Sequence, residues 1–140
     1  MDENIKRSFI IDNYKHPFNK EKLEGAQVRA KSATCIDDIS LQLELDSGII
    51  RNAYFDGEAC VISTSATSII LKNIIGKTID EALKFLENYE AMINEEEYDA
   101  DLLNDLIVFD NIYKQPNRKQ CALISAGAII KYLKENYERK

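Results

Sequence analysis

The feature that most constrains the fold is a change of hydrophobic period along the chain. Apolar and polar residues alternate over residues 39–45, and this run ends at a turn sequence, Asp46-Ser47-Gly48. A second run over residues 49–55 ends at Asp56-Gly57 and pairs with the first as a predicted β-hairpin. Residues 27–33 can supply a third strand. The sequence therefore predicts a small antiparallel sheet.

Beyond this hairpin the apolar residues recur at helical spacing, as they also do near the start of the chain. We predict helices over residues 2–15, from Cys60 to a stop at Gly76, from a capped start at Thr78, and over residues 121–137. Residues 95–112 are acidic and then apolar, and we expect them to be helical in part. The predicted fold class is α+β, with a three-stranded antiparallel sheet packed against several helices and a single domain over residues 1–140.

Composition and charge exclude several classes of function. The net charge of -6 argues against nucleic acid and anionic membranes, because both require clustered positive charge. The most apolar helical stretch, residues 60–75, carries too many polar residues for a membrane span. The first residues are polar and lack the pattern of a secretory signal. We therefore expect a cytoplasmic protein with reduced cysteines.

The sequence has three cysteines, and each lies at a predicted break between elements. Cys35 follows a strand, Cys60 occupies a strand-to-helix turn, and Cys121 begins the last predicted helix. Helix N-termini favour the thiolate form of a cysteine. Asp37 can add an oxygen ligand beside Cys35, and four such ligands suit tetrahedral zinc. Spacing alone does not separate such a joint site from three packed thiols.

Four motifs that surround these residues carry a family resemblance over nearly the whole chain. They are Ile11-Asp12-Asn13-Tyr14-Lys15-His16-Pro17-Phe18-Asn19, Thr34-Cys35-Ile36-Asp37, Phe55-Asp56-Gly57-Glu58-Ala59-Cys60-Val61-Ile62-Ser63 and Arg118-Lys119-Gln120-Cys121-Ala122. In this order they resemble the IscU/NifU N-terminal-domain family of iron–sulfur cluster assembly proteins. Gln120, where IscU-type members have histidine, and the extra stretch near residues 90–110 are similar to the SufU type.

The resemblance implies a zinc ion held by Cys35, Asp37, Cys60 and Cys121 at one end of the fold. It implies that Cys35 accepts persulfide sulfur from a SufS-, IscS- or NifS-like cysteine desulfurase and passes it to downstream iron–sulfur assembly proteins. This would be a sulfurtransferase-like activity. An alternative is a scaffold on which a [2Fe–2S] cluster forms, since the same ligands also suit iron. A third is a purely structural metal.

A few further residues in or near these motifs bear on the predicted site. Arg118 is a candidate for contact with a persulfide or a partner, although a solvated loop arginine is as well supported. Ile36 replaces the family's usual glycine, and its β-branched side chain resists positive φ, which bears on the transfer step. His16 is assigned to the surface, and the serines that follow Cys60 to packing and capping.

Overall fold

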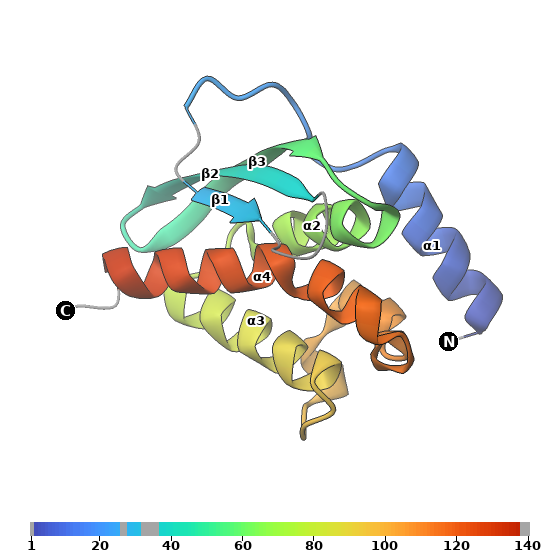
Figure 1. Cartoon of the computed structure of the whole chain (residues 1–140). Helices are drawn as coiled ribbons and strands as arrows, with labels where there is room; N and C mark the ends of the chain where they lie inside the picture. Colours follow the sequence, from blue (N-terminus) through green and yellow to red (C-terminus); the bar gives the residue numbers. More distant parts are fainter. Residues whose placement is uncertain (1, 26–27, 32–36, 138–140) are drawn as a thin grey trace.

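The computed structural model describes residues 2–25, 28–31 and 37–137. Its strands and helices follow one another in this order: α1 Glu3–Lys15, β1 Val28–Lys31, β2 Asp38–Asp46, β3 Ile49–Glu58, α2 Val61–Ile74, α3 Ile79–Ile93, the short 3₁₀ helices η1 Ala100–Leu102, η2 Asn104–Phe109 and η3 Ile112–Lys114, and α4 Pro116–Tyr137. The predicted α+β class is confirmed (Figure 1).

The three strands form one antiparallel sheet in the order β1-β2-β3. Strand β2 pairs with β3 from Asp38 opposite Glu58 to Asp46 opposite Ile49, with a register shift between Glu44 and Leu45. The predicted hairpin turn is present, and Ser47 and Gly48 both have positive φ, as a two-residue type I′ turn requires. Alternate β2 residues are buried, so the apolar residues of the alternating pattern lie on the side of the strand that faces the core.

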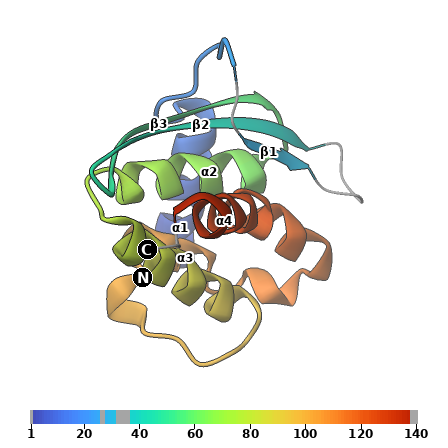
Figure 2. The same ribbon diagram turned by 90° about the vertical axis from the view of Figure 1, so that its left-hand side faces the viewer.

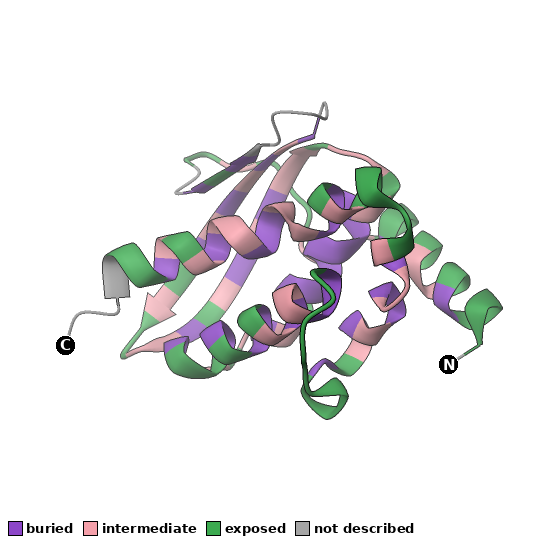
Figure 3. Cartoon of the chain, turned by 60° about the horizontal axis from the view of Figure 1, so that its bottom comes forward, coloured by how far each residue is buried: buried purple, intermediate pink, exposed green. Residues whose placement is uncertain are grey.

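Helices α2 and α4 lie side by side beneath one face of the sheet, and α3 packs against α4 on the side away from the sheet (Figures 1 and 2). Helix α1 packs along α2. Because α2 lies between the sheet and other helices, most of its residues are buried (Figure 3). The described part of the chain has no helix long and apolar enough to cross a membrane.

Two predicted helix starts agree with the structure. Cys60 is the N-cap of α2, and its sulfur accepts a hydrogen bond from the backbone N–H of Ser63 at 3.4 Å. Thr78 and Glu81 form a reciprocal capping box at the start of α3. The first of these caps places a cysteine just beyond the end of β3.

The predicted start of the last helix is wrong. Helix α4 begins at Pro116 rather than at Cys121. Proline suits the first helical position because its φ is already helical and its missing N–H would have no partner there. Cys121 therefore lies in the second turn of α4.

The predicted end of the second hairpin strand is also wrong, since β3 continues past Asp56-Gly57 to Glu58. Gly57 allows this continuation, because its φ is +128° and a Cβ at this position would lie 2.1 Å from the carbonyl oxygen of Asp38. Strand β1 lies within the predicted residues 27–33, of which residues 27, 32 and 33 are outside the described residues. Residues 95–112 include two short 3₁₀ helices and the first residue of a third, in keeping with partial helicity.

We predict that Gly57→Ala destabilises the fold more than Gly48→Ala does. Both positions have positive φ, which costs an alanine about 1–2 kcal/mol. Only Gly57 has backbone atoms where the new methyl group would lie, whereas Gly48 has open space. Urea unfolding of both variants measures the difference, and equal losses of unfolding free energy would show that the close approach to Asp38 is unimportant.

Candidate metal centre

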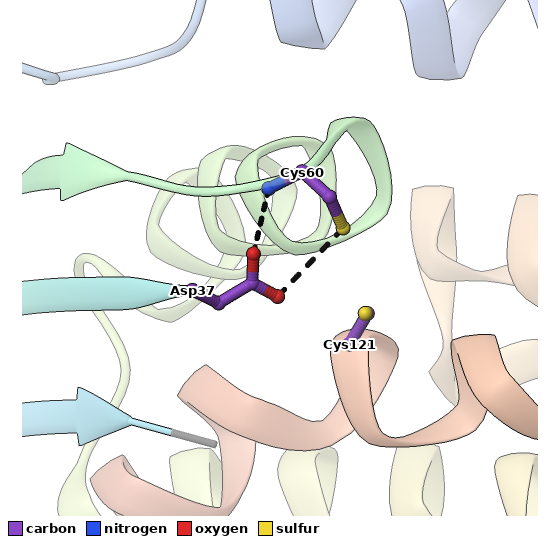
Figure 4. A group of neighbouring side chains, drawn as sticks. All are labelled: Asp37, Cys60 and Cys121. Carbon is purple, nitrogen blue, oxygen red and sulfur yellow. Dashed lines mark hydrogen bonds between the residues drawn. The ribbon is translucent and has the colours of Figure 1, made fainter. Parts of the chain in front are cut away.

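Three predicted ligands from separate segments meet at one end of the sheet (Figure 4). Asp37 directly precedes β2, Cys60 is the N-cap of α2, and Cys121 lies on α4. One ligand atom from each of the three lies within 4.8 Å of the others. Asp37 and Cys121 are buried and Cys60 is half-buried. The fourth predicted ligand, Cys35, lies outside the described residues, as does Ile36.

The sheet register brings Asp37 to the start of α2. Because Asp38 pairs with Glu58, the residue before β2 lies beside the residues that follow β3. One carboxylate oxygen of Asp37, Oδ1, accepts the backbone N–H of Cys60 at 2.7 Å. The other, Oδ2, accepts the hydroxyl of Ser63 and lies 3.7 Å from the sulfur of Cys60. The carboxylate is thus held by two donors from the first turn of α2.

Buried hydroxyl groups set the position of α4 along α2. Thr67 donates to the carbonyl oxygen of Ser63 at 2.7 Å, and its Oγ1 lies 2.5 Å from Oγ of Ser125 on α4. The hydroxyl of Tyr89 on α3 donates to the carbonyl oxygen of Ala122 at 2.7 Å. Buried polar groups require such partners, so these contacts favour one register between the helices. In that register Cys121 faces Cys60.

Asp37 is a buried carboxylate that keeps its charge. Burial raises its pKa, but hydrogen bonds from Ser63, from the Cys60 backbone and from the thiols of Cys121 and Cys60 outweigh this effect. The pKa of Asp37 therefore lies below its ordinary value. No lysine or arginine of the described residues forms an ion pair with it. A bound cation would offset the cost of burying this negative charge.

One pair of donor atoms has the separation that ligands take in a tetrahedral zinc site. Zinc bonds of about 2.3 Å to sulfur and about 2.1 Å to oxygen imply a sulfur-to-oxygen separation of about 3.6 Å in a tetrahedron. The Cys60 sulfur and Asp37 Oδ2 lie 3.7 Å apart. Thiolates with one carboxylate also suit iron. The structure therefore contains a possible Asp/Cys/Cys metal site.

Only one of the two cysteines lies at the helix N-terminus that the sequence predicts for it. Cys60 has the predicted position, as the N-cap of α2. Cys121 does not, because five residues of α4 precede it, and its sulfur lies 3.9 Å from the carbonyl oxygen of Asn117. The positive end of the helix dipole acts mainly within the first turn. The dipole argument made from the sequence therefore does not apply to Cys121.

Arg118 is exposed on the first turn of α4. It lines a cavity of about 350 Å³ together with residues of α1 and with Val61 at the start of α2. Its contact with a persulfide or a partner stays a prediction. His16 is exposed at the end of α1, as expected.

The serines of α2 do not all have the packing and capping role predicted for them. Ser65 donates to carbonyl oxygens, including that of Ile10 on α1. Ser68 donates to Asn13, which is also on α1. Ser63 instead contacts Asp37. Its spacing of three residues from the N-cap Cys60 predicts that its side chain faces back toward the cap, but not that it reaches Asp37.

Comparisons with known proteins agree with this fold. The family model of the NifU-like N-terminal domain matches residues 5–122, and the chain belongs to this family. The zinc-dependent sulfurtransferase SufU of Bacillus subtilis is 35% identical over 131 residues, which cover 92% of this chain and 89% of that protein. The iron–sulfur cluster assembly scaffold protein IscU of Thermotoga maritima is 31% identical, with 90% of each chain covered.

A solved structure supports the same assignment. The iron–sulfur cluster assembly scaffold protein for the SUF system from Fervidobacterium islandicum superposes with a TM-score of 0.77 at 31% identity. The match covers 86% of this chain and 90% of that one. The resemblance indicated by the four sequence motifs is therefore confirmed.

We predict that the contact between Thr67 and Ser125 stabilises the protein. Thr67→Val leaves the buried hydroxyl of Ser125 without this partner and should lower the free energy of unfolding by about 1–3 kcal/mol. Adding Ser125→Ala removes the unpaired group, so the double variant should lose less than the sum of the single losses. Urea unfolding of all four proteins tests this, and strictly additive losses would contradict it.

Proposed function

We propose that this chain is an iron–sulfur cluster assembly protein that accepts sulfur from a cysteine desulfurase in the cytoplasm. The observation that carries the proposal is the convergence of Asp37, Cys60 and Cys121 at one end of the sheet. Cys35 lies only two residues before Asp37 in the chain. The similarity to SufU of Bacillus subtilis, whose name states a zinc-dependent sulfurtransferase, supports the same activity.

We further propose that zinc is the resident metal, held by Cys35, Asp37, Cys60 and Cys121. A zinc ion keeps bound thiols deprotonated at neutral pH while shielding them from oxidation and from unwanted exchange. Asp37 supplies an oxygen ligand whose charge is already stabilised by the first turn of α2. This chain's part is to hold that carboxylate and two sulfurs close together in a largely buried position.

Cys35 is the proposed sulfur acceptor. Its thiolate attacks the terminal sulfur of the desulfurase persulfide, forming a new S–S bond as the donor's S–S bond breaks. The donor cysteine leaves as a thiolate with the electron pair, so the step needs no external oxidant or reductant. The persulfide on Cys35 then passes sulfur to a downstream assembly protein by the same exchange. Arg118 is proposed to contact the persulfide or the partner.

A second candidate function is a scaffold that assembles a [2Fe–2S] cluster on the same cysteines. The names of the IscU relatives favour it, since that of Thermotoga maritima is called a scaffold protein. Thiolate ligands also suit iron–sulfur clusters. The two functions differ in cargo, because the transfer protein carries sulfur alone whereas the scaffold carries iron with sulfide.

Metal and acid-labile sulfide content of protein purified without added metal separates the candidates. We expect about one zinc per chain and no sulfide in the parent protein. Asp37→Ala should retain less zinc, because it removes one of four ligands, whereas His16→Ala should retain all of it. Iron with matching sulfide would favour the scaffold. Absence of metal from the parent protein would refute the site.

Desulfurase turnover tests the transfer step directly. Alanine formation by a cysteine desulfurase should rise when this protein is added, because its acceptor removes the persulfide from the enzyme. Cys35→Ala should abolish the rise while the protein remains folded. An unchanged rise with Cys35→Ala would exclude Cys35 as the acceptor. A purely structural metal predicts no rise at all, and no alkylation of Cys35 even beside the partner.

A further inference from the structure

The hydroxyl of Ser63 lies where the three segments that carry the candidate ligands meet. It donates to Oδ2 of Asp37, lies 3.5 Å from the sulfur of Cys60, and lies 3.2 Å from the carbonyl oxygen of Cys121. Ser63 is fully buried. A single side chain thus contacts the loop before β2, the N-cap of α2 and the second turn of α4.

This hydroxyl has one proton to donate and more than one acceptor within reach. The carboxylate of Asp37 is charged and is the stronger acceptor, so it accepts the hydrogen bond of this hydroxyl in the structure. The second acceptor, the carbonyl of Cys121, remains within reach if the carboxylate turns away. The buried hydroxyl therefore has a partner in either arrangement, which limits the cost of moving Asp37.

The two donors of α2 together fix the orientation of the Asp37 carboxylate. The Cys60 N–H binds Oδ1 and the Ser63 hydroxyl binds Oδ2, so the carboxylate has little freedom to rotate about its last bond. Oδ2 then points toward the sulfur atoms of Cys60 and Cys121 (Figure 4). Without the hydroxyl, the Cys60 N–H would be the one remaining oxygen or nitrogen donor of α2 on this carboxylate, beside the weaker contacts of the two thiols.

We propose that Ser63 is a positioning residue that acts through Asp37 to set the metal affinity of the site. The inference rests on the proposed metal-binding function and deepens it. Partners that orient metal ligands contribute about 10- to 100-fold to affinity. The role belongs to the hydroxyl group, so threonine at this position preserves it and alanine does not.

Helix α2 supplies a matched control in Ser68. It is the same residue type on the same helix, and it is equally buried. Its hydroxyl donates to Asn13 at 2.9 Å and accepts the backbone N–H of Phe18 at 2.8 Å. These contacts connect α2 to α1 and to the segment that follows α1, and they involve none of the candidate ligands. Ser68→Ala therefore reports the general cost of removing a buried hydroxyl from α2.

The test is zinc affinity, measured by competition with a chromophoric chelator on folded protein. Ser63→Ala should weaken zinc binding by about 10- to 100-fold, whereas Ser68→Ala should stay within about twofold of the parent. Circular dichroism of the metal-free variants checks folding. If metal-free Ser63→Ala does not fold, Ser63→Thr replaces it in the test. Threonine should then retain affinity within about threefold, and a tenfold loss in that folded variant overturns the proposal.

A double-mutant cycle separates positioning from general structure. In the Asp37→Ala background, Ser63→Ala should change zinc affinity by no more than about twofold, because the ligand on which it acts is gone. A loss as large as in the parent background overturns the proposal, as does parent-like affinity of Ser63→Ala alone. Failure of the parent chain to bind zinc refutes the proposed metal site instead, so the two failures are distinguishable.

Discussion

The site depends on one buried interaction, the attachment of the Asp37 carboxylate to the first turn of α2. Its two oxygens accept hydrogen bonds from the N–H of Cys60 and from the hydroxyl of Ser63. These bonds join the start of β2 to the start of α2. These bonds hold a charged group in the interior without a basic partner from the described residues. They stabilise a negative charge at the candidate site, and they place the carboxylate beside the sulfur of Cys60.

The interior of the molecule is organised around the same helix. Helix α2 is rich in serine and threonine although most of it is buried, and its hydroxyls contact α1 on one side and α4 on another. Fully satisfied polar contacts of this kind specify one packing arrangement more strictly than apolar contacts do. The helix that begins at Cys60 thereby also positions the helix that carries Cys121. The geometry of the candidate site and the packing of the interior therefore depend on the same helix.

Much of the fold follows from local patterns in the sequence. The alternation over residues 39–45 and the turn at Ser47-Gly48 predicted the hairpin, and the Thr78–Glu81 spacing predicted the capping box. The errors lie where tertiary or positional effects override the pattern. Strand β3 passes Gly57 because a glycine there permits a close approach to Asp38. Helix α4 begins five residues early because Pro116 suits a first helical position.

The sequence by itself determined the family, the sheet with its helices and the residue types of the candidate site, because these follow from motifs and periodicity. Only the tertiary structure decided that Asp37, Cys60 and Cys121 lie within 4.8 Å of one another. Only it assigned the hydroxyl of Ser63 to Asp37 rather than to packing alone. The physical reason is that strand register and buried hydrogen bonds between distant segments set these distances, and no local pattern of the chain encodes them.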